Sequence, residues 1–173
     1  MNWYQVDLTL RGLEIAAAQL NGNAAERDAL VERFIDMYEF GWLAEAFTYA
    51  AVLGVEMAVP ARAAPFEAVL EAVTADVDAV LLPDMPVRWQ EAVWLAAAVG
   101  QGGGVPQAAA STMDQPGAVN GTFQLMISSF HTLTRVPQLP RKTAAGWAEL
   151  MRDSFAAGAG VEDDPEEDQR PDT

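Results

Sequence analysis

The chain has no cysteine and a single histidine, and these two absences exclude several classes of site. Without thiols there are no disulfides, no thiolate nucleophile and no cysteine-ligated metal. With only His131, clusters of histidine ligands are excluded as well. Carboxylate-only sites are left, but the sequence has no Asp-rich calcium loop and no Glu-x-x-His pair of the kind that binds two metals in helical bundles. We therefore expect no metal and no cofactor.

Basic residues are also scarce, with 10 against 25 acidic residues and a formal net charge of −15. Residues 161–173 hold seven acids and one arginine, so the rest of the chain still carries 18 acids and nine bases. An acidic surface of this kind repels nucleic-acid phosphates and anionic lipids. It suits a basic protein partner, or it simply keeps a hydrophobic chain in solution. We expect neither nucleic acid nor membrane as a partner.

No segment has the pattern of a membrane span or of a secretory leader. The longest apolar run, residues 46–59, is interrupted by Glu56 and is shorter than the roughly 20 residues that cross a bilayer. The first residues, MNWYQVDLTLRGLE, have no basic n-region and no apolar h-region. Together with the missing cysteines, these features predict a cytoplasmic location. A hydrophobic content of 51% with 20% charged residues predicts a globular domain.

Hydrophobic periodicity predicts helices along most of the chain. Residues 24–40 combine a broad apolar stripe with a charged face, and residues 42–59, apolar nearly all round, are expected to form the central helix. A break is expected near Gly41, and Pro60 is expected to end the central helix. Residues 122–130 fit a helix or a strand, and we favour the helix. Apolar and polar residues alternate over residues 3–10, which predicts a short strand or extended arm.

The fold class is therefore mainly α: a compact bundle of about five to six helices with a short N-terminal strand. Residues 1–160 are expected to form a single domain. It consists of a main bundle (1–100), a linker rich in glycine and proline (101–117) and a less regular C-terminal part (118–160). Residues 161–173 are expected to be a disordered acidic tail.

One segment has the residue types that nucleophilic catalysis needs. On a helix, Ser128 and His131 would be neighbours one turn apart, and Glu149 or Asp153 could orient the imidazole. The segment lacks the glycine elbow that exposes a nucleophile. An ordinary polar helix face is the favoured interpretation, and a small enzyme or ligand-binding bundle that uses His131 is the alternative.

Aromatic residues at helical spacing form a second pattern of interest. Phe34, Tyr38 and Trp42, followed by Phe47, could border a cofactor, but core packing is the usual role of such a stripe. We therefore expect these rings in the core.

The helix expected over residues 65–82 has two faces that could pack. Large apolar residues fall on one side, and alanines edged by carboxylates fall on the other. Small side chains let another helix approach closely, and flanking acids steer a basic partner. We therefore predict a binding surface that consists of Glu67, Ala68, Glu71, Ala72, Ala75, Asp78 and Ala79.

These features favour a non-catalytic, acidic protein-interaction module, such as an adaptor, an assembly factor or a small chaperone. The expected partner is a protein that is basic or offers a helix, and self-association stays open. Besides the small enzyme, a second alternative is an acidic nucleic-acid mimic. Acids that alternate with arginines on the helix over residues 24–40 argue against it.

Overall fold

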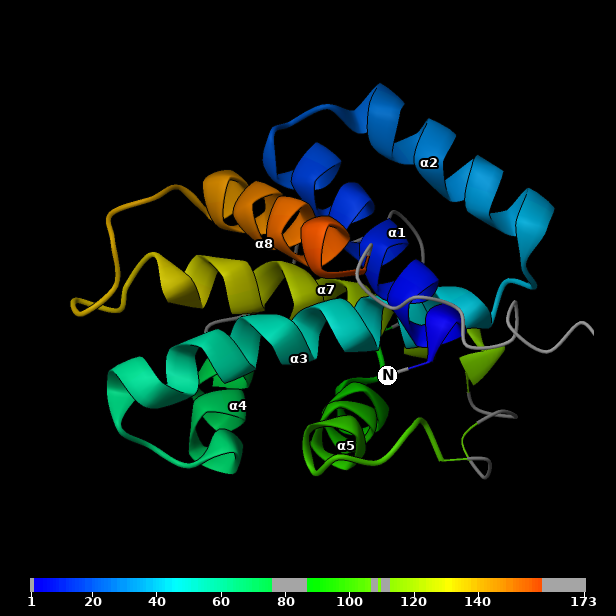
Figure 1. Cartoon of the computed structure of the whole chain (residues 1–173). Helices are drawn as coiled ribbons and strands as arrows, with labels where there is room; N and C mark the ends of the chain where they lie inside the picture. Colours follow the sequence, from blue (N-terminus) through cyan, green and yellow to red (C-terminus); the bar gives the residue numbers. More distant parts are fainter. Residues whose placement is uncertain (1, 76–86, 107–108, 110–112, 160–173) are drawn as a thin grey trace, which may run out of the picture.

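A computed structural model describes residues 2–75, 87–106, 109 and 113–159 of the chain. Within these ranges the chain forms seven helices and no strand (Figure 1), which confirms the mainly α fold. The helices are α1 (Trp3–Leu20), α2 (Ala24–Met37), α3 (Trp42–Arg62), α4 (Phe66–Ala75), α5 (Trp89–Gly100), α7 (Pro116–Leu133) and α8 (Ala144–Ala159). The expected acidic tail lies outside the described residues.

Helices α3 and α7 form the centre of the bundle and share its largest interface. Helices α1, α4 and α5 pack on both of them, α8 packs on α1 and α7, and α2 lies on the outside against α1 (Figure 1). Glycines permit the close crossings. A Cβ on Gly12 would lie 2.5 Å from the carbonyl oxygen of Ala46, and one on Gly54 would collide with the side chain of Ser129.

The break at Gly41 is confirmed, because α2 ends at Met37 and α3 begins at Trp42. The central helix continues slightly past Pro60, which lies in its last turn. By length and composition α3 could cross a membrane, the one such helix in the described part of the chain. However, 67% of its apolar window is buried inside the bundle, as in the core helix of a soluble protein.

The predicted N-terminal strand is wrong, because α1 starts at Trp3 and runs unbroken to Leu20. A capping box fixes the start. The Asn2 side chain accepts a hydrogen bond from the Gln5 amide (2.9 Å), and the Gln5 side chain accepts one from the Asn2 amide (3.0 Å). Leu8 and Leu13 are then buried on one helical face, so the alternation along residues 3–10 has no structural role.

The described residues of the C-terminal part, 118–159, are more regular than expected, because most of them lie in α7 and α8. The preference for helix over strand at residues 122–130 is confirmed. Polar residues buried along α7 obscure its hydrophobic pattern, and several of them donate hydrogen bonds to backbone carbonyl oxygens. For example, the Thr122 hydroxyl donates to the Ala118 carbonyl oxygen at 3.0 Å, and the Ser128 hydroxyl donates to that of Val73 at 2.8 Å.

Candidate functional site

Five aromatic side chains contact one another where the start of α1, the end of α2 and the start of α3 meet. The ring centroids are 5.0 Å apart for Phe34 and Tyr38, 5.9 Å for Tyr38 and Trp42, and 4.6 Å for Trp42 and Tyr4. Trp3 continues the series at 6.4 Å from Tyr4. We call these five residues the aromatic row. It joins three helix ends into one surface.

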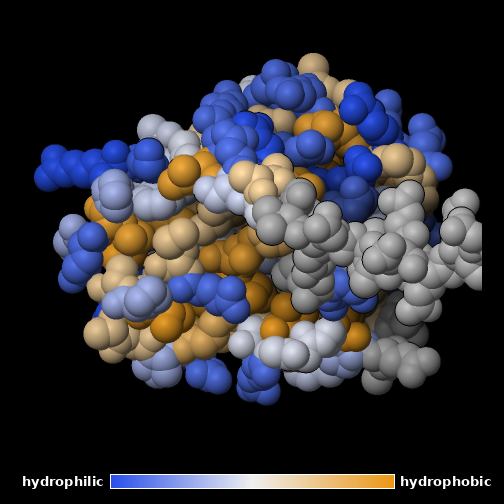
Figure 2. Space-filling view, in the orientation of Figure 1, coloured by the Kyte–Doolittle hydropathy of each residue, from blue (hydrophilic) through white to orange (hydrophobic). Residues whose placement is uncertain are grey.

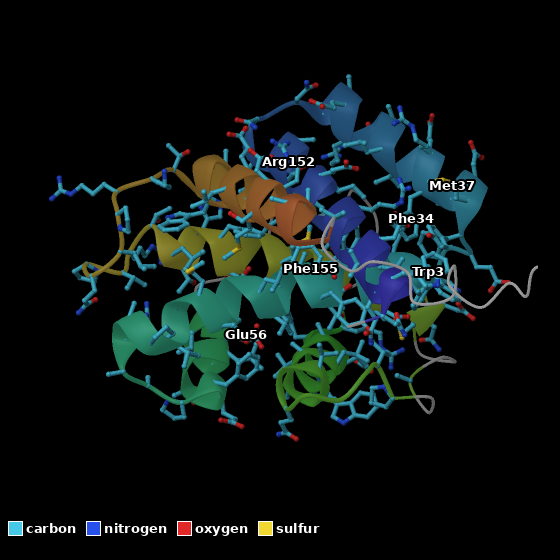
Figure 3. All side chains as sticks on the ribbon, viewed as in Figure 1. Trp3, Phe34, Met37, Glu56, Arg152 and Phe155 are labelled. Carbon is cyan, nitrogen blue, oxygen red and sulfur yellow. The ribbon has the colours of Figure 1, made fainter. Side chains whose placement is uncertain are left out.

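The aromatic row runs from the core to solvent. Phe34 is 1% exposed, whereas Trp3 at the other end is 76% exposed, and the three rings between them are half-buried. The rings differ in burial because the helix is interrupted between α2 and α3. The extended backbone at Tyr38 turns the chain out of α2 before α3 begins. The labelled side chains of Trp3, Phe34 and Met37 lie toward the same end of the molecule in Figure 3. The expectation that this stripe belongs to the core therefore holds for Phe34 and Phe47, which are each 1% exposed, whereas Tyr38 and Trp42 are half-buried.

Two rings of the row border a cavity of about 220 Å³, which we call the acidic pocket. Its walls combine aromatic, apolar and acidic groups: Tyr4, Glu39, Gly41, Trp42, Glu45, Val105, Pro106, Met113 and Asp114. Among the residues that the structure describes, the lining therefore holds three carboxylates and no base. Its volume is below the roughly 300–1,000 Å³ of typical cofactor and drug sites, so it suits a single side chain or a small organic group.

Glu45 is held in place by two tyrosines. The Tyr4 hydroxyl donates to its Oε2 (2.9 Å) and the Tyr49 hydroxyl to its Oε1 (2.8 Å), while Gln5 Nε2 donates to the Tyr49 oxygen (3.3 Å). Burial, together with the negative charge of Glu45, raises the pKa of Tyr49 to about 12. Burial and the hydrogen bond to Glu45 also raise the pKa of Tyr4. Both hydroxyls therefore remain protonated donors at neutral pH.

Glu39 and Asp114 are exposed at the rim of the acidic pocket. Asp114 occupies the space where a side chain on Gly41 would lie, which places its carboxylate beside the first residues of α3. A helix N-terminus favours a negative charge there. Among the described residues, no ion pair joins Glu39, Glu45 or Asp114 to a base. By contrast, nearby Asp7 pairs with Arg11 at 2.9 Å and accepts a hydrogen bond from Tyr38.

A second cavity, of about 250 Å³, lies farther along α3. Gln5 and Tyr49 border it, opposite Gly102, Gly103 and Gly104, and Glu56 is its one acidic residue. Burial raises the pKa of Glu56. The described lining residues include one aromatic ring, that of Tyr49, and one carboxylate, that of Glu56. This cavity therefore indicates a ligand class less clearly than the acidic pocket does.

The surface predicted on α4 faces solvent. Glu67, Ala68, Glu71 and Ala75 are exposed and Ala72 is half-buried, while Val69, Leu70 and Val73 pack into the core. Asp78 and Ala79 lie outside the described residues. This placement leaves the face accessible, and binding there stays a prediction.

Most of the residues proposed for catalysis bond to residues outside the proposed site. Ser128 is 5% exposed and donates its hydroxyl to Val73 on α4, whereas His131 is exposed one turn later on α7. Glu149 accepts a hydrogen bond from Asn21 at 2.8 Å, and Asp153 pairs with Arg152 at 2.9 Å. The hydroxyl, the imidazole and the carboxylates are therefore not brought together as a triad.

A broad apolar area is a further surface feature. Figure 2 shows mainly hydrophilic side chains over α2 and an apolar area along α3, between α8 and α4. Exposed Met57 on α3 and Leu150 on α8 belong to the larger apolar side chains that reach solvent. No charge pattern on this area indicates the chemistry of a partner, so the acidic pocket is the stronger candidate.

No protein-family model, curated protein or solved structure matches this chain. The function is therefore argued from the chemistry of the site alone.

Proposed function

We propose that the protein is a non-catalytic interaction module that binds a basic segment of a partner protein at the acidic pocket. One observation supports this proposal above all others. Three carboxylates that pair with no base in the described part of the chain line a cavity that has an aromatic wall. Both the carboxylates and the aromatic wall stabilise a bound cation. The carboxylates attract its positive charge, and so does the electron-rich face of Trp or Tyr.

The surroundings of the pocket favour a protein partner over a free small molecule. Trp3, whose ring contacts that of the lining residue Tyr4, is 76% exposed, and Met37, two residues before Glu39, is 48% exposed. Tryptophan side chains such as that of Trp3 often contribute a large share of the binding energy at protein interfaces. The net charge of −15 would accelerate the approach of a basic partner. A hydrolase that uses Ser128 and His131 gains no support, because the Ser128 hydroxyl is committed to Val73.

The test is the binding of a fluorescently labelled peptide that carries two arginines and two lysines among alanines. The double variant Glu39→Gln, Asp114→Asn neutralises two exposed carboxylates of the pocket without changing their shape. We expect it to bind about 10-fold more weakly than the wild type by fluorescence anisotropy, a change of about 1.4 kcal/mol.

The matched control is Glu67→Gln, Glu71→Gln, which removes the same charge from the α4 surface. We expect its affinity to stay within about 2-fold of the wild type, since long-range attraction between exposed charges is screened by salt. Equal weakening in both variants would mean attraction to the overall charge and would overturn the proposal. If the control variant binds the peptide more weakly than the pocket variant does, the binding site is on α4 instead.

A further inference from the structure

The acidic pocket supports a more specific inference, which rests on the proposed function. We infer that the group it receives is the guanidinium of an arginine side chain in preference to the ammonium of a lysine. The placement of the carboxylates, the hydrogen bonds of Glu45 and the aromatic wall each support this choice.

The carboxylates are spread around the pocket. Glu39 lies between α2 and α3, Glu45 is in the first turn of α3, and Asp114 comes from the segment that precedes α7. Within the described ranges, no three acidic or histidine side chains converge closely enough to hold one metal ion. An ammonium is a compact charge that also needs its acceptors close together. A guanidinium distributes five N–H donors over a plane, so it can reach acceptors that lie apart.

The hydrogen bonds of Glu45 restrict what it can offer a ligand. Each of its two oxygens already accepts a tyrosine hydroxyl, from Tyr4 and from Tyr49. Glu39 and Asp114 therefore supply most of the free acceptor capacity, and both are exposed and able to adjust. A carboxylate with both oxygens free can pair with a guanidinium through two parallel hydrogen bonds, a geometry that lysine cannot form.

The aromatic wall favours the same group. The rings of Tyr4 and Trp42 lie 4.6 Å apart at 88°, so the two rings meet at a right angle beside the carboxylates. A planar guanidinium stacks on an aromatic face, and arginine makes such contacts more often than lysine. A cavity of about 220 Å³ has room for the end of one such side chain.

The experiment uses four peptides that share the same flanking basic residues and differ at one central position. That position is arginine, lysine, citrulline or alanine, and binding to the full chain is measured by isothermal titration calorimetry. We expect the arginine peptide to bind about 5-fold more tightly than the lysine peptide. Citrulline has nearly the shape of arginine without its charge, so its peptide should bind about as weakly as the alanine peptide.

The variant Glu39→Gln, Asp114→Asn provides the second measurement. In this variant the preference for arginine over lysine should disappear, since the free acceptors are altered. If arginine and lysine peptides bind the wild type equally, the inference is wrong and the proposed function stands. If citrulline binds as tightly as arginine, charge recognition is wrong as well. If none of the four peptides binds, the proposed function itself fails.

Discussion

Two surfaces of this protein expose carboxylates beside apolar groups, and they differ in what the apolar groups can do. On α4 the large residues Val69, Leu70 and Val73 are no more than 3% exposed, and the exposed residues are two glutamates and two alanines. At the acidic pocket, rings of Tyr4 and Trp42 remain accessible and enclose a cavity. Charge alone steers a partner, whereas buried aromatic contacts determine how long it stays.

The difference follows from where each surface lies in the fold. A single amphipathic helix such as α4 buries its large side chains on one face and leaves its small and charged residues outside. The pocket forms where three helix ends meet, and rings from separate elements cannot all be covered there. Binding sites that select a particular chemical group are therefore expected where several helix ends meet, more than on the exposed face of one helix.

The largest expected effect on stability concerns Tyr49, which has no counterpart on α4. Its pKa is about 12 in the folded chain and about 10 when unfolded, so folding favours the protonated hydroxyl. The stabilisation is complete below pH ~10 and is lost as the pH rises toward 12, by about 2 kcal/mol. Tyr49→Phe should remove this part of the alkaline loss and cost about 1 kcal/mol at pH 7, because two hydrogen bonds disappear.

Urea unfolding between pH 7 and pH 12 measures both the cost at neutral pH and the alkaline loss. Thr74→Val on α4 is a matched control, because it also removes a hydroxyl hydrogen bond, from Thr74 Oγ1 to the Leu70 carbonyl oxygen (2.8 Å). It removes no titrating group, so its cost should be the same at each pH. A parallel alkaline decline in wild type and Tyr49→Phe would show that Tyr49 does not cause it.

The helices were predictable because their periodicity and caps are local. Asn23 caps α2 by accepting from the Glu26 amide at 3.1 Å, and Thr143 accepts from Gly146 at 3.0 Å at the start of α8. A strand was predicted at residues 3–10 because their apolar residues fit both the alternation of a strand and the spacing of a helix. The capping box at Asn2 favours the helix. The central position of α7 was hidden because polar groups such as Asn120 and Gln124 are buried along it.

The acidic pocket could be predicted only in part. The spacing of Phe34, Tyr38 and Trp42, with a break at Gly41, was visible in the sequence and marked the place. That Tyr38 and Trp42 are only half-buried depends on how the chain passes from α2 to α3, which is set by tertiary packing. Asp114 lies far along the chain from Glu39, and no local pattern could indicate that they share a cavity.

Gly41→Ala should disturb the pocket with little effect on the fold. The backbone of Gly41 is α-helical (φ −62°, ψ −23°), so alanine is permitted, but its Cβ takes the place of the Asp114 carboxylate. We expect the arginine peptide to bind about 5-fold more weakly, a change of about 1 kcal/mol. Gly158→Ala on α8, where nothing lies within 4 Å of the added methyl, is the control and should bind like the wild type. Unchanged binding by Gly41→Ala would argue that Asp114 does not contact the ligand.

The smallest effect is expected for Ala72→Arg on α4. Ala72 is half-buried, and the long arginine stem can lie along the helix while its charge reaches solvent. The free energy of unfolding should therefore change by no more than about 0.5 kcal/mol, and peptide binding and the mass measured by light scattering should stay the same. Loss of stability or of an assembled state would instead mean that a helix packs on the alanine face. In that case the α4 surface predicted from the sequence, and not the acidic pocket, would be the principal contact surface.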